Sequence, residues 1–153
     1  MLSADTNLFL YAANPDCPQH AAASGFFREQ SGTGKEFVLC ELVLVEIYMQ
    51  LRNPAILRKP LSAVSAADFC GRLRANPAWQ LVDYEPAVSE GLWRWARSTP
   101  SAFRRIIDAR LALTLLHHGV TGFATANVKD FEELGFERLW NPLAGSPASR
   151  PPD

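Results

Sequence analysis

The sequence predicts an α/β fold, a three-layer α/β/α sandwich with a mostly parallel central sheet, on three observations. Short apolar segments alternate with longer segments of helical character along the chain. The apolar segments have no polar face, which is typical of strands covered by helices on both sides. The chain has 153 residues, a usual length for one domain. We therefore expect one domain over residues 1–143 and a disordered tail, rich in Pro, Ser, Gly and Ala, over 144–153.

The first strands and helices follow from local signals. A strand at residues 1–4 leads into a short helix that ends near Ala13. Asp16 is the expected cap of a second helix, over about 17–30. The segment "FVLC" predicts a buried strand, and "ELVLVEIYMQLRN" predicts a helix that Pro54 ends.

The same alternation continues to the C-terminus. Ser65 and Asp68 have the spacing of a capping box, which predicts a helix that ends near Asn76. "WQLVDY" predicts a strand, and "PAVSEGLWRWARS" predicts a helix with Pro86 at its start. "IIDARLALTLLHHG" predicts an apolar helix that Gly119 ends, "VTGFATAN" a further strand, and "ERLWNP" an edge strand.

Composition and charge exclude several classes of protein. Hydrophobic residues make up 48% and charged residues 20%, unlike a disordered chain, and a net charge of −1 is unlike that of a generally basic nucleic-acid binder. The start lacks the basic region of a signal peptide, and no apolar run reaches the length of a membrane span. The cysteines form no C-x-x-C pair. We expect a cytoplasmic protein with reduced core thiols at Cys17, Cys40 and Cys70.

Acidic residues stand at unusual places in this pattern. Asp5 follows the first apolar strand, Glu46 is surrounded by apolar residues of a helix, and Asp108 begins the most apolar helix. Asn127 and Asp130 follow the strand that contains "FAT". Ligands of parallel α/β sheets bind at the carboxyl ends of the strands. These side chains are therefore expected to meet at one edge of the sheet.

Carboxylates that converge repel one another unless a cation lies between them. Oxygen ligands without Cys or His suit Mg²⁺ or Mn²⁺ better than zinc. Such an ion keeps several waters, and one of them can attack a phosphodiester. The pattern therefore predicts metal-dependent hydrolysis of a phosphate ester.

Each acid also has a structural interpretation when it is taken alone. Asp5 has the sequence context of a turn or a helix cap, and Glu46 can be a helix residue that reaches solvent. Asp108 can complement the dipole of its helix or pair with a nearby arginine, and Asp130 can start an exposed helix. The expected convergence of these acids is what favours a catalytic site.

The quoted segments "DTNLFLYA", "LVLVEIYMQLRNP", "IIDARLALTLLHHG", "GFATANVKDF" and "LWNPL" together resemble the PIN-domain ribonucleases, particularly the VapC toxins of prokaryotic toxin–antitoxin pairs. The resemblance covers roughly residues 1–143. It implies a parallel α/β/α sandwich and a Mg²⁺- or Mn²⁺-dependent endoribonuclease in which Asp5, Glu46 and Asp108 bind the metal.

The resemblance also assigns supporting positions. Many members carry an Asp shortly after the threonine that matches Thr125, and this chain has Asn127 there, with Asp130 three residues later. We expect a supporting role for Asn127 and a water-mediated role for Asp130. Thr6 and Asn7 resemble the small polar pair after the family's first Asp, and they either orient the Asp5 carboxylate or cap the following helix.

Basic and aromatic residues near Asp108 have two interpretations each. The arginines suit RNA phosphates, a solvated helix face or an antitoxin's acidic tail; they are Arg94, Arg97, Arg104 and Arg105. The aromatic residues suit base stacking or packing in the core or a dimer interface; they are Trp93, Trp95 and Phe103. Tyr48 and Met49 are expected in the core, and His117 and His118 are expected to compensate a helix dipole.

The main hypothesis is thus a metal-dependent endoribonuclease toxin with an RNA substrate, a cognate antitoxin and a homodimeric assembly, the last two by resemblance. The alternative is a non-catalytic PIN-like module that binds RNA or an antitoxin, which Asn127 at the fourth acidic position favours. A phosphatase with an Asp nucleophile commonly needs a second Asp where this chain has Asn7. A dinucleotide-binding oxidoreductase is disfavoured because the first turn lacks G-x-G-x-x-G.

Overall fold

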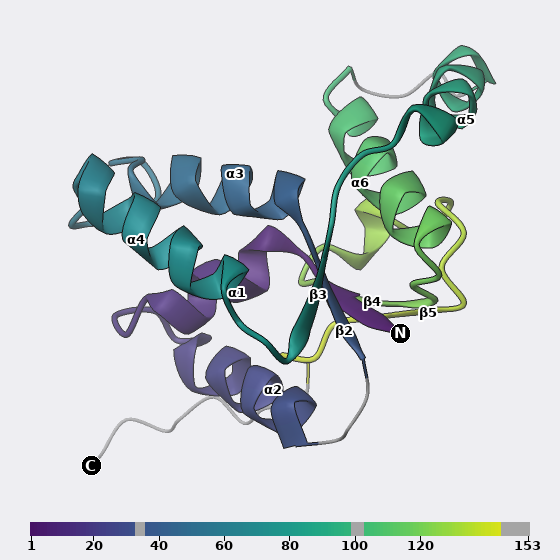
Figure 1. Ribbon diagram of the computed structural model, residues 1–153. Helices are drawn as coiled ribbons and strands as arrows, with labels where there is room; N and C mark the ends of the chain where they lie inside the picture. Colours follow the sequence, from purple (N-terminus) through teal and green to yellow (C-terminus); the bar gives the residue numbers. More distant parts are fainter. Residues whose placement is uncertain (33–35, 99–102, 145–153) are drawn as a thin grey trace.

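In the computed structural model, five strands form one parallel sheet in the order β3-β2-β1-β4-β5 (Figure 1). The structure describes residues 1–32, 36–98 and 103–144. Within these ranges the strands are β1 (Leu2–Ala4), β2 (Phe37–Cys40), β3 (Trp79–Val82), β4 (Gly122–Ala124) and β5 (Arg138–Trp140). The predicted parallel sheet is confirmed, and β1 lies at its centre.

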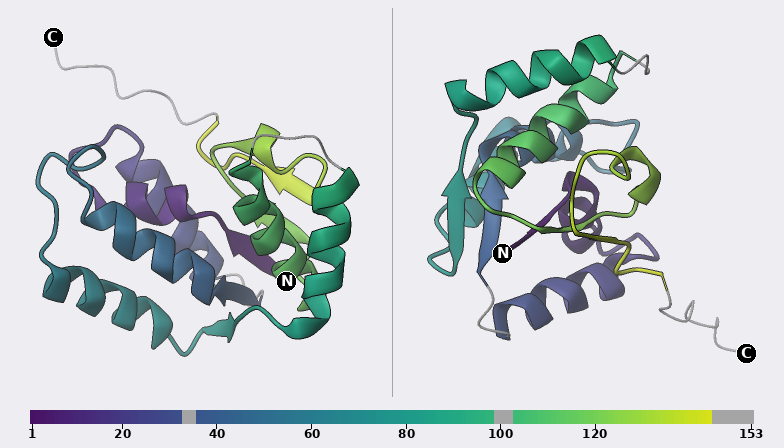
Figure 2. Two further views of the ribbon diagram at one scale, coloured as in Figure 1. Left: turned by 90° about the horizontal axis from the view of Figure 1, so that it is seen from above. Right: turned by 90° about the vertical axis from the view of Figure 1, so that its right-hand side faces the viewer.

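Helices connect the strands and cover both faces of the sheet. In the right-hand view of Figure 2, α2 lies on one side of the strands while α5 and α6 lie on the other, which gives the predicted α/β/α layers. The helices are α1 (Thr6–Ala13), α2 (His20–Gly32), α3 (Glu41–Leu51), α4 (Ala63–Arg74), α5 (Pro86–Ser98) and α6 (Arg105–His117), with a short 3₁₀ helix, η1 (Val128–Asp130).

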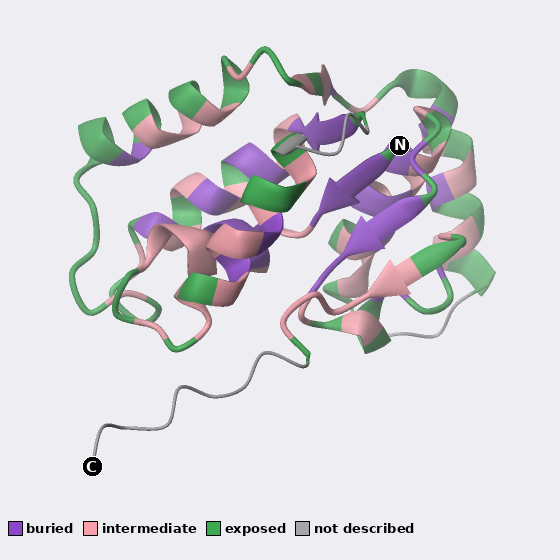
Figure 3. Cartoon of the chain, turned by 90° about the horizontal axis from the view of Figure 1, so that it is seen from below, coloured by how far each residue is buried: buried purple, intermediate pink, exposed green. Residues whose placement is uncertain are grey.

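The central strands carry the core. Every residue of β1, β2 and β4 is buried, whereas the edge strands β3 and β5 are partly exposed (Figure 3). The apolar residues of α6 and α3 that face the sheet complete this core, and Leu115 and Ile47 are fully buried. Burial of such side chains is the main driving force of folding. It fixes the carboxyl ends of the central strands on rigid elements.

Two helix starts differ from the sequence prediction. Helix α4 begins at Ala63, and its cap is Ser62, whose hydroxyl accepts the Ser65 N–H at 3.1 Å. The prediction that Ser65 and Asp68 form the capping box was wrong, because an earlier serine has the same spacing to a backbone donor. Helix α2 begins at His20, so Asp16 does not cap it.

Some burial predictions were also wrong. Met49 is 62% exposed on the outer side of α3, although Tyr48 beside it packs against the core. Trp93 and Phe103 are exposed, so core packing is excluded for both, whereas Trp95 does pack against the core. All three cysteines are free thiols, but only Cys40 is buried; Cys17 and Cys70 are half-buried, so their placement in the core was wrong.

Three further sequence predictions concern a helix end, membrane-spanning segments and the C-terminal tail. Gly119 ends α6 with a φ of 82°, a left-handed conformation that favours glycine, as predicted. Within the described ranges, no helix has the length and apolar character needed to cross a lipid bilayer. The predicted disordered tail lies outside the described residues from position 145 onward.

The register of the sheet positions the predicted site. Ala4 of β1 pairs with Ala124 of β4, so the next residues, Asp5 and Thr125, emerge together at the carboxyl edge. The Asp5 N–H donates to the Ala124 carbonyl at 2.9 Å and extends this pairing by one step. The first strand therefore presents Asp5 at a fixed point between two neighbouring chain segments.

Candidate active site

The carboxylate of Asp5 is held by three hydrogen-bond donors. One oxygen accepts the Thr6 N–H at 2.8 Å, while the other accepts the Asn7 amide and the Thr125 hydroxyl, each at 2.7 Å. Among the described residues, no Lys or Arg forms an ion pair with Asp5. Asp5 is thus both the cap of α1 and a fixed carboxylate at the sheet edge, so its two interpretations are compatible.

Thr125 connects Asp5 to the loop after β4. Its buried hydroxyl donates to Asp5 and accepts the Asn127 N–H at 2.9 Å. The Asn7 side chain also connects α1 to this loop. Its amide N–H donates to the Thr125 hydroxyl at 3.3 Å, and its oxygen accepts the Ala126 N–H at 3.3 Å. Asn127 supports this arrangement through its backbone N–H. The residue itself is exposed to solvent.

Glu46 reaches the site from α3. The buried Thr6 hydroxyl donates to a Glu46 oxygen at 2.7 Å, which ties α1 to α3. Of the two interpretations of Thr6, the one in which its hydroxyl orients Asp5 is wrong, because it is the Thr6 N–H that donates to Asp5. Consequently Thr6 connects two of the predicted acids, one through its N–H and one through its side chain.

Asp108 lies in the first turn of α6 and faces the same region. Its charged neighbours are Asp130, Glu46 and Arg105, each close enough to influence its ionisation. Arg105 also donates to the Asp130 carbonyl at 2.8 Å and so holds the end of η1 against α6. The structure therefore brings Asp130, whose residue is exposed, to the neighbourhood of Asp108.

The electrostatics of these acids reflect their proximity. Burial, with further contributions from Glu46 and Asp108, raises the pKa of Asp5 from 3.8 to about 6 although the Thr125 hydrogen bond lowers it. Burial and the negative charges of Asp130 and Glu46 raise the pKa of Asp108 from 3.8 to about 6 against the effect of Arg105. Mutual repulsion of this kind is typical of sites that receive a cation.

The donor set has the chemistry for a hard cation, because Asp5, Glu46 and Asp108 offer carboxylate oxygens without a competing Cys or His. Their positions are less compact than a formed site. Within residues 1–32, 36–98 and 103–144, no three Asp, Glu, His or Cys side chains lie close enough together, in their present positions, to hold a metal ion. The acids are near neighbours whose ligand atoms would have to close around an ion.

The predicted RNA-binding arginines divide into two groups. Arg94 and Arg97 lie on the exposed side of α5, and Arg94 pairs with Glu90 at 2.9 Å. Arg104 and Arg105 lie at the start of α6, four and three residues before Asp108. Only the second group is carried by the same helix as a predicted catalytic acid.

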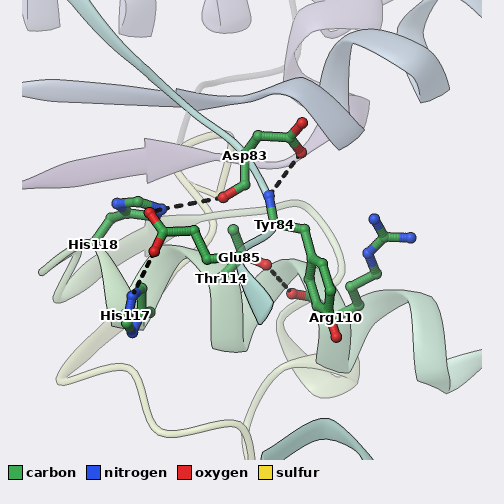
Figure 4. A network of polar contacts seen from close by, with 7 residues as sticks. All are labelled: Asp83, Tyr84, Glu85, Arg110, Thr114, His117 and His118. Carbon is green, nitrogen blue, oxygen red and sulfur yellow. Dashed lines mark hydrogen bonds and ion pairs between the residues drawn. The ribbon is translucent and has the colours of Figure 1, made fainter. Parts of the chain in front are cut away.

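A second polar network joins the far end of α6 to the connection between β3 and α5 (Figure 4). His117 and His118 lie 3.4 and 3.6 Å from the carboxylate of Glu85, and a ring nitrogen of His118 lies 3.1 Å from the Asp83 carbonyl oxygen. From their place at the helix end, the two histidines were predicted to compensate the helix dipole. Glu85 was missed because no local pattern links residues so far apart in the chain.

Comparison with known proteins places the chain in a family. The model of the PIN domain matches residues 4–137. The chain belongs to the PIN-domain family. The match runs from the last residue of β1 to the residue before β5 and includes each of the acids described above, and the predicted family is thereby confirmed.

Named relatives of this PIN-domain chain agree with that assignment. It is 48% identical over 143 residues to Ribonuclease VapC24 of Mycobacterium tuberculosis, an alignment that covers 94% of this chain and 97% of the relative. The fold is similar to that of VapC20 of M. tuberculosis, described as a Sarcin-Ricin loop cleaving toxin, with a TM-score of 0.61 and 16% identity over 80% of this chain and 87% of the other. FitAcB of Neisseria gonorrhoeae is similar with a TM-score of 0.64 and 17% identity over 94% and 99%.

Proposed function

We propose that this PIN-domain protein is a Mg²⁺- or Mn²⁺-dependent endoribonuclease that acts as the toxin of a toxin–antitoxin pair. The observation that carries the proposal is that Glu46 and Asp108 both lie close enough to Asp5 to raise its pKa, while among the described residues no Lys or Arg forms an ion pair with Asp5. RNA as the substrate is supported by the near full-length similarity to a protein named Ribonuclease VapC24.

In this proposal, Asp5, Glu46 and Asp108 hold the metal ion, with Asp130 contributing to the negative field. The ion, when bound, would supply the charge that offsets carboxylate repulsion and favours hydrolysis of a phosphodiester. Thr125 and Asn7 keep the Asp5 carboxylate in one orientation, as outer hydrogen-bond partners do at metal sites.

An antitoxin and a second copy of the chain are the proposed protein partners. The antitoxin is supported by the fold similarity to VapBC2 of Rickettsia felis, whose structure is described as bound to a DNA fragment from the VapBC2 promoter. The TM-score is 0.62, with 12% identity over 92% of this chain and 97% of the other. The exposed apolar side chains of α3, Val45 and Met49, are available for such contacts.

The alternative is a PIN-domain module that binds RNA or an antitoxin without cleaving RNA. The separation of the acids favours it, because no three of them converge tightly among the described residues. Asn127 in place of a fourth acid also favours it. The two functions differ in one measurable property, metal-dependent cleavage.

The test uses purified full-length chain and single-stranded RNA, with Mg²⁺, Mn²⁺ or EDTA. We expect cleavage with either metal and none in EDTA. Asp5→Asn and Asp108→Asn each remove a negative ligand, and cleavage should fall about 100-fold or more. Asp16→Asn changes an exposed acid remote from the site and serves as the matched control, with unchanged cleavage.

Three results would contradict the proposal. These are cleavage that persists in EDTA, cleavage that neither substitution reduces, and RNA binding without cleavage by the unaltered protein under every metal condition. The last result would support the non-catalytic module instead.

A further inference from the structure

We propose that Phe103 and Arg104, at the start of α6, form a binding platform for one nucleotide of single-stranded RNA, in which the base stacks on the Phe103 ring and Arg104 binds the phosphate. This inference rests on the proposed function, because it assigns the substrate's position at the same site. It adds to the acids a surface that would position the RNA strand, since Phe103 is not one of the proposed metal ligands.

The first observation is the exposure of Phe103. Its side chain is 83% exposed, more than any other large apolar residue of the described ranges. Trp93 on α5 is 53% exposed by comparison. Phe103 therefore contributes little to the core, although aromatic rings are among the side chains that gain most from burial. A ring held in water beside a catalytic region has an open face for a planar ligand.

The second observation is the position of Arg104. The guanidinium carbon of Arg104 lies 5.6 Å from the centroid of the Phe103 ring, within the range of a cation–π contact. Among the described residues Arg104 forms no ion pair, whereas Arg105 is engaged by the Asp130 carbonyl. Arg104 consequently keeps its charge available for an external anion while it lies against the aromatic ring.

The third observation is the distance along the helix to Asp108. Arg104 is the N-cap of α6, with right-handed helical backbone angles, and it precedes Asp108 by four residues, the spacing that brings two side chains to the same side of a helix. Four residues of helix advance about 6 Å along the axis. A phosphate bound by Arg104 would thus lie close to the acids, and the attached base would lie over Phe103.

RNA fits this surface better than another protein surface does. A protein interface centred here would bury the Arg104 charge, which is costly unless the partner supplies an acid. An RNA strand brings a phosphate with every base, and stacking on an aromatic ring accepts any base. The platform would therefore fix the strand relative to the acids without selecting a sequence.

The experiment measures binding of a mixed-sequence 12-nucleotide single-stranded RNA that carries 2-aminopurine, in EDTA to prevent cleavage. An abasic strand of equal length is the second probe. Phe103→Ala should weaken binding of the RNA about 5- to 100-fold and abolish the change in 2-aminopurine fluorescence. It should leave binding of the abasic strand unchanged, whereas Arg104→Ala should weaken binding of both strands.

Two further variants complete the design. Phe103→Trp keeps an aromatic face and should restore binding of the RNA to within about twofold of the unaltered chain. Val64→Ala changes another exposed apolar side chain, on α4, and should have no effect on either probe. Sedimentation of each variant should show an unchanged oligomeric state.

The platform would be contradicted if Phe103→Ala bound the RNA as tightly as the unaltered chain, or if it changed the oligomeric state instead. Its failure is distinguishable from failure of the proposed function. A chain that cleaves RNA equally well with and without Phe103 would overturn the platform alone. A chain that binds RNA through Phe103 but never cleaves it would overturn the endoribonuclease and leave the platform.

Discussion

The carboxyl end of β1 and the start of α6 supply the two halves of the site in different ways. At β1, Asp5 is fixed by hydrogen bonds from Thr6, Asn7 and Thr125. At α6, the dominant influences on the Asp108 carboxylate are burial and the negative charges of its neighbours. Asp5 is thus positioned by the sheet and by its hydrogen-bond donors. Asp108 is positioned by a helix, and the ionised form of its carboxylate is disfavoured by burial and by the charges nearby.

This difference shows where the energy of folding and the needs of function conflict. Hydrogen bonds to Asp5 stabilise both the fold and the orientation of the carboxylate. Repulsion at Asp108 destabilises the folded chain until a cation offsets it. Loss of a donor to Asp5 should therefore lower the stability of the fold, and loss of the Asp108 charge should raise it, while both reduce catalysis.

The largest combined effect is expected for Thr125→Val. The substitution keeps the shape of a buried side chain but removes the hydroxyl that donates to Asp5. RNA cleavage should fall about 10- to 100-fold, because outer partners of metal ligands have effects of this size. The free energy of unfolding should fall by about 1–3 kcal/mol, because Asp5 loses a donor.

The matched control is Thr114→Val. Thr114 is also buried, but its hydroxyl bonds only to the Arg110 carbonyl within α6. Cleavage assays and urea unfolding of both variants check the prediction. Equal loss of cleavage in both would mean that Thr125 has no special relation to Asp5.

An effect of opposite sign, on stability alone, is expected for Asp108→Asn in EDTA. The pKa of Asp108 is raised from 3.8 to about 6, so the folded chain binds a proton more tightly than the unfolded chain. This difference makes the unaltered chain lose stability as the pH rises from about 4 to about 6. At pH 7 the substitution should therefore increase the free energy of unfolding, by about 1–3 kcal/mol after allowance for solvent screening at a half-buried group.

Thermal unfolding across pH 4 to 7 measures this effect as the difference between the two chains. The melting temperature of the variant should exceed that of the unaltered chain by about 2–4 °C for each kcal/mol at pH 7, and the gap should close near pH 4. A gap that stays constant with pH would show that the Asp108 charge is not the cause.

Much of the sheet could be predicted because its strands are short, apolar and separated by clear turn and cap signals. The placement of Asp5 after a buried strand and of Asp108 in the first turn of an apolar helix was also evident. Helix starts were less certain, since Ser62 and Ser65 offer alternative caps a few residues apart. A choice between them depends on the backbone of the preceding loop, which sequence spacing does not specify.

Contacts between distant segments could not be predicted from local patterns. The bond between Thr6 and Glu46 joins residues 40 positions apart, and the pair of Glu85 with His117 depends on how α5 and α6 pack. Exposure of Met49 was missed, and that of Phe103 was left open between alternatives, for a related reason. An apolar side chain in an apolar sequence is usually buried, and only the packed structure shows which ones remain at the surface.

The most direct test of the central claim, that Asp5, Glu46 and Asp108 act as one metal site, is calorimetric titration of the chain with Mn²⁺. Asp5→Asn and Asp108→Asn are titrated in parallel, with Asp16→Asn as the control. We predict that the unaltered chain and the control bind Mn²⁺ alike, and that each of the other variants binds it at least about 10-fold more weakly. Unchanged Mn²⁺ binding by either of these variants would contradict the claim.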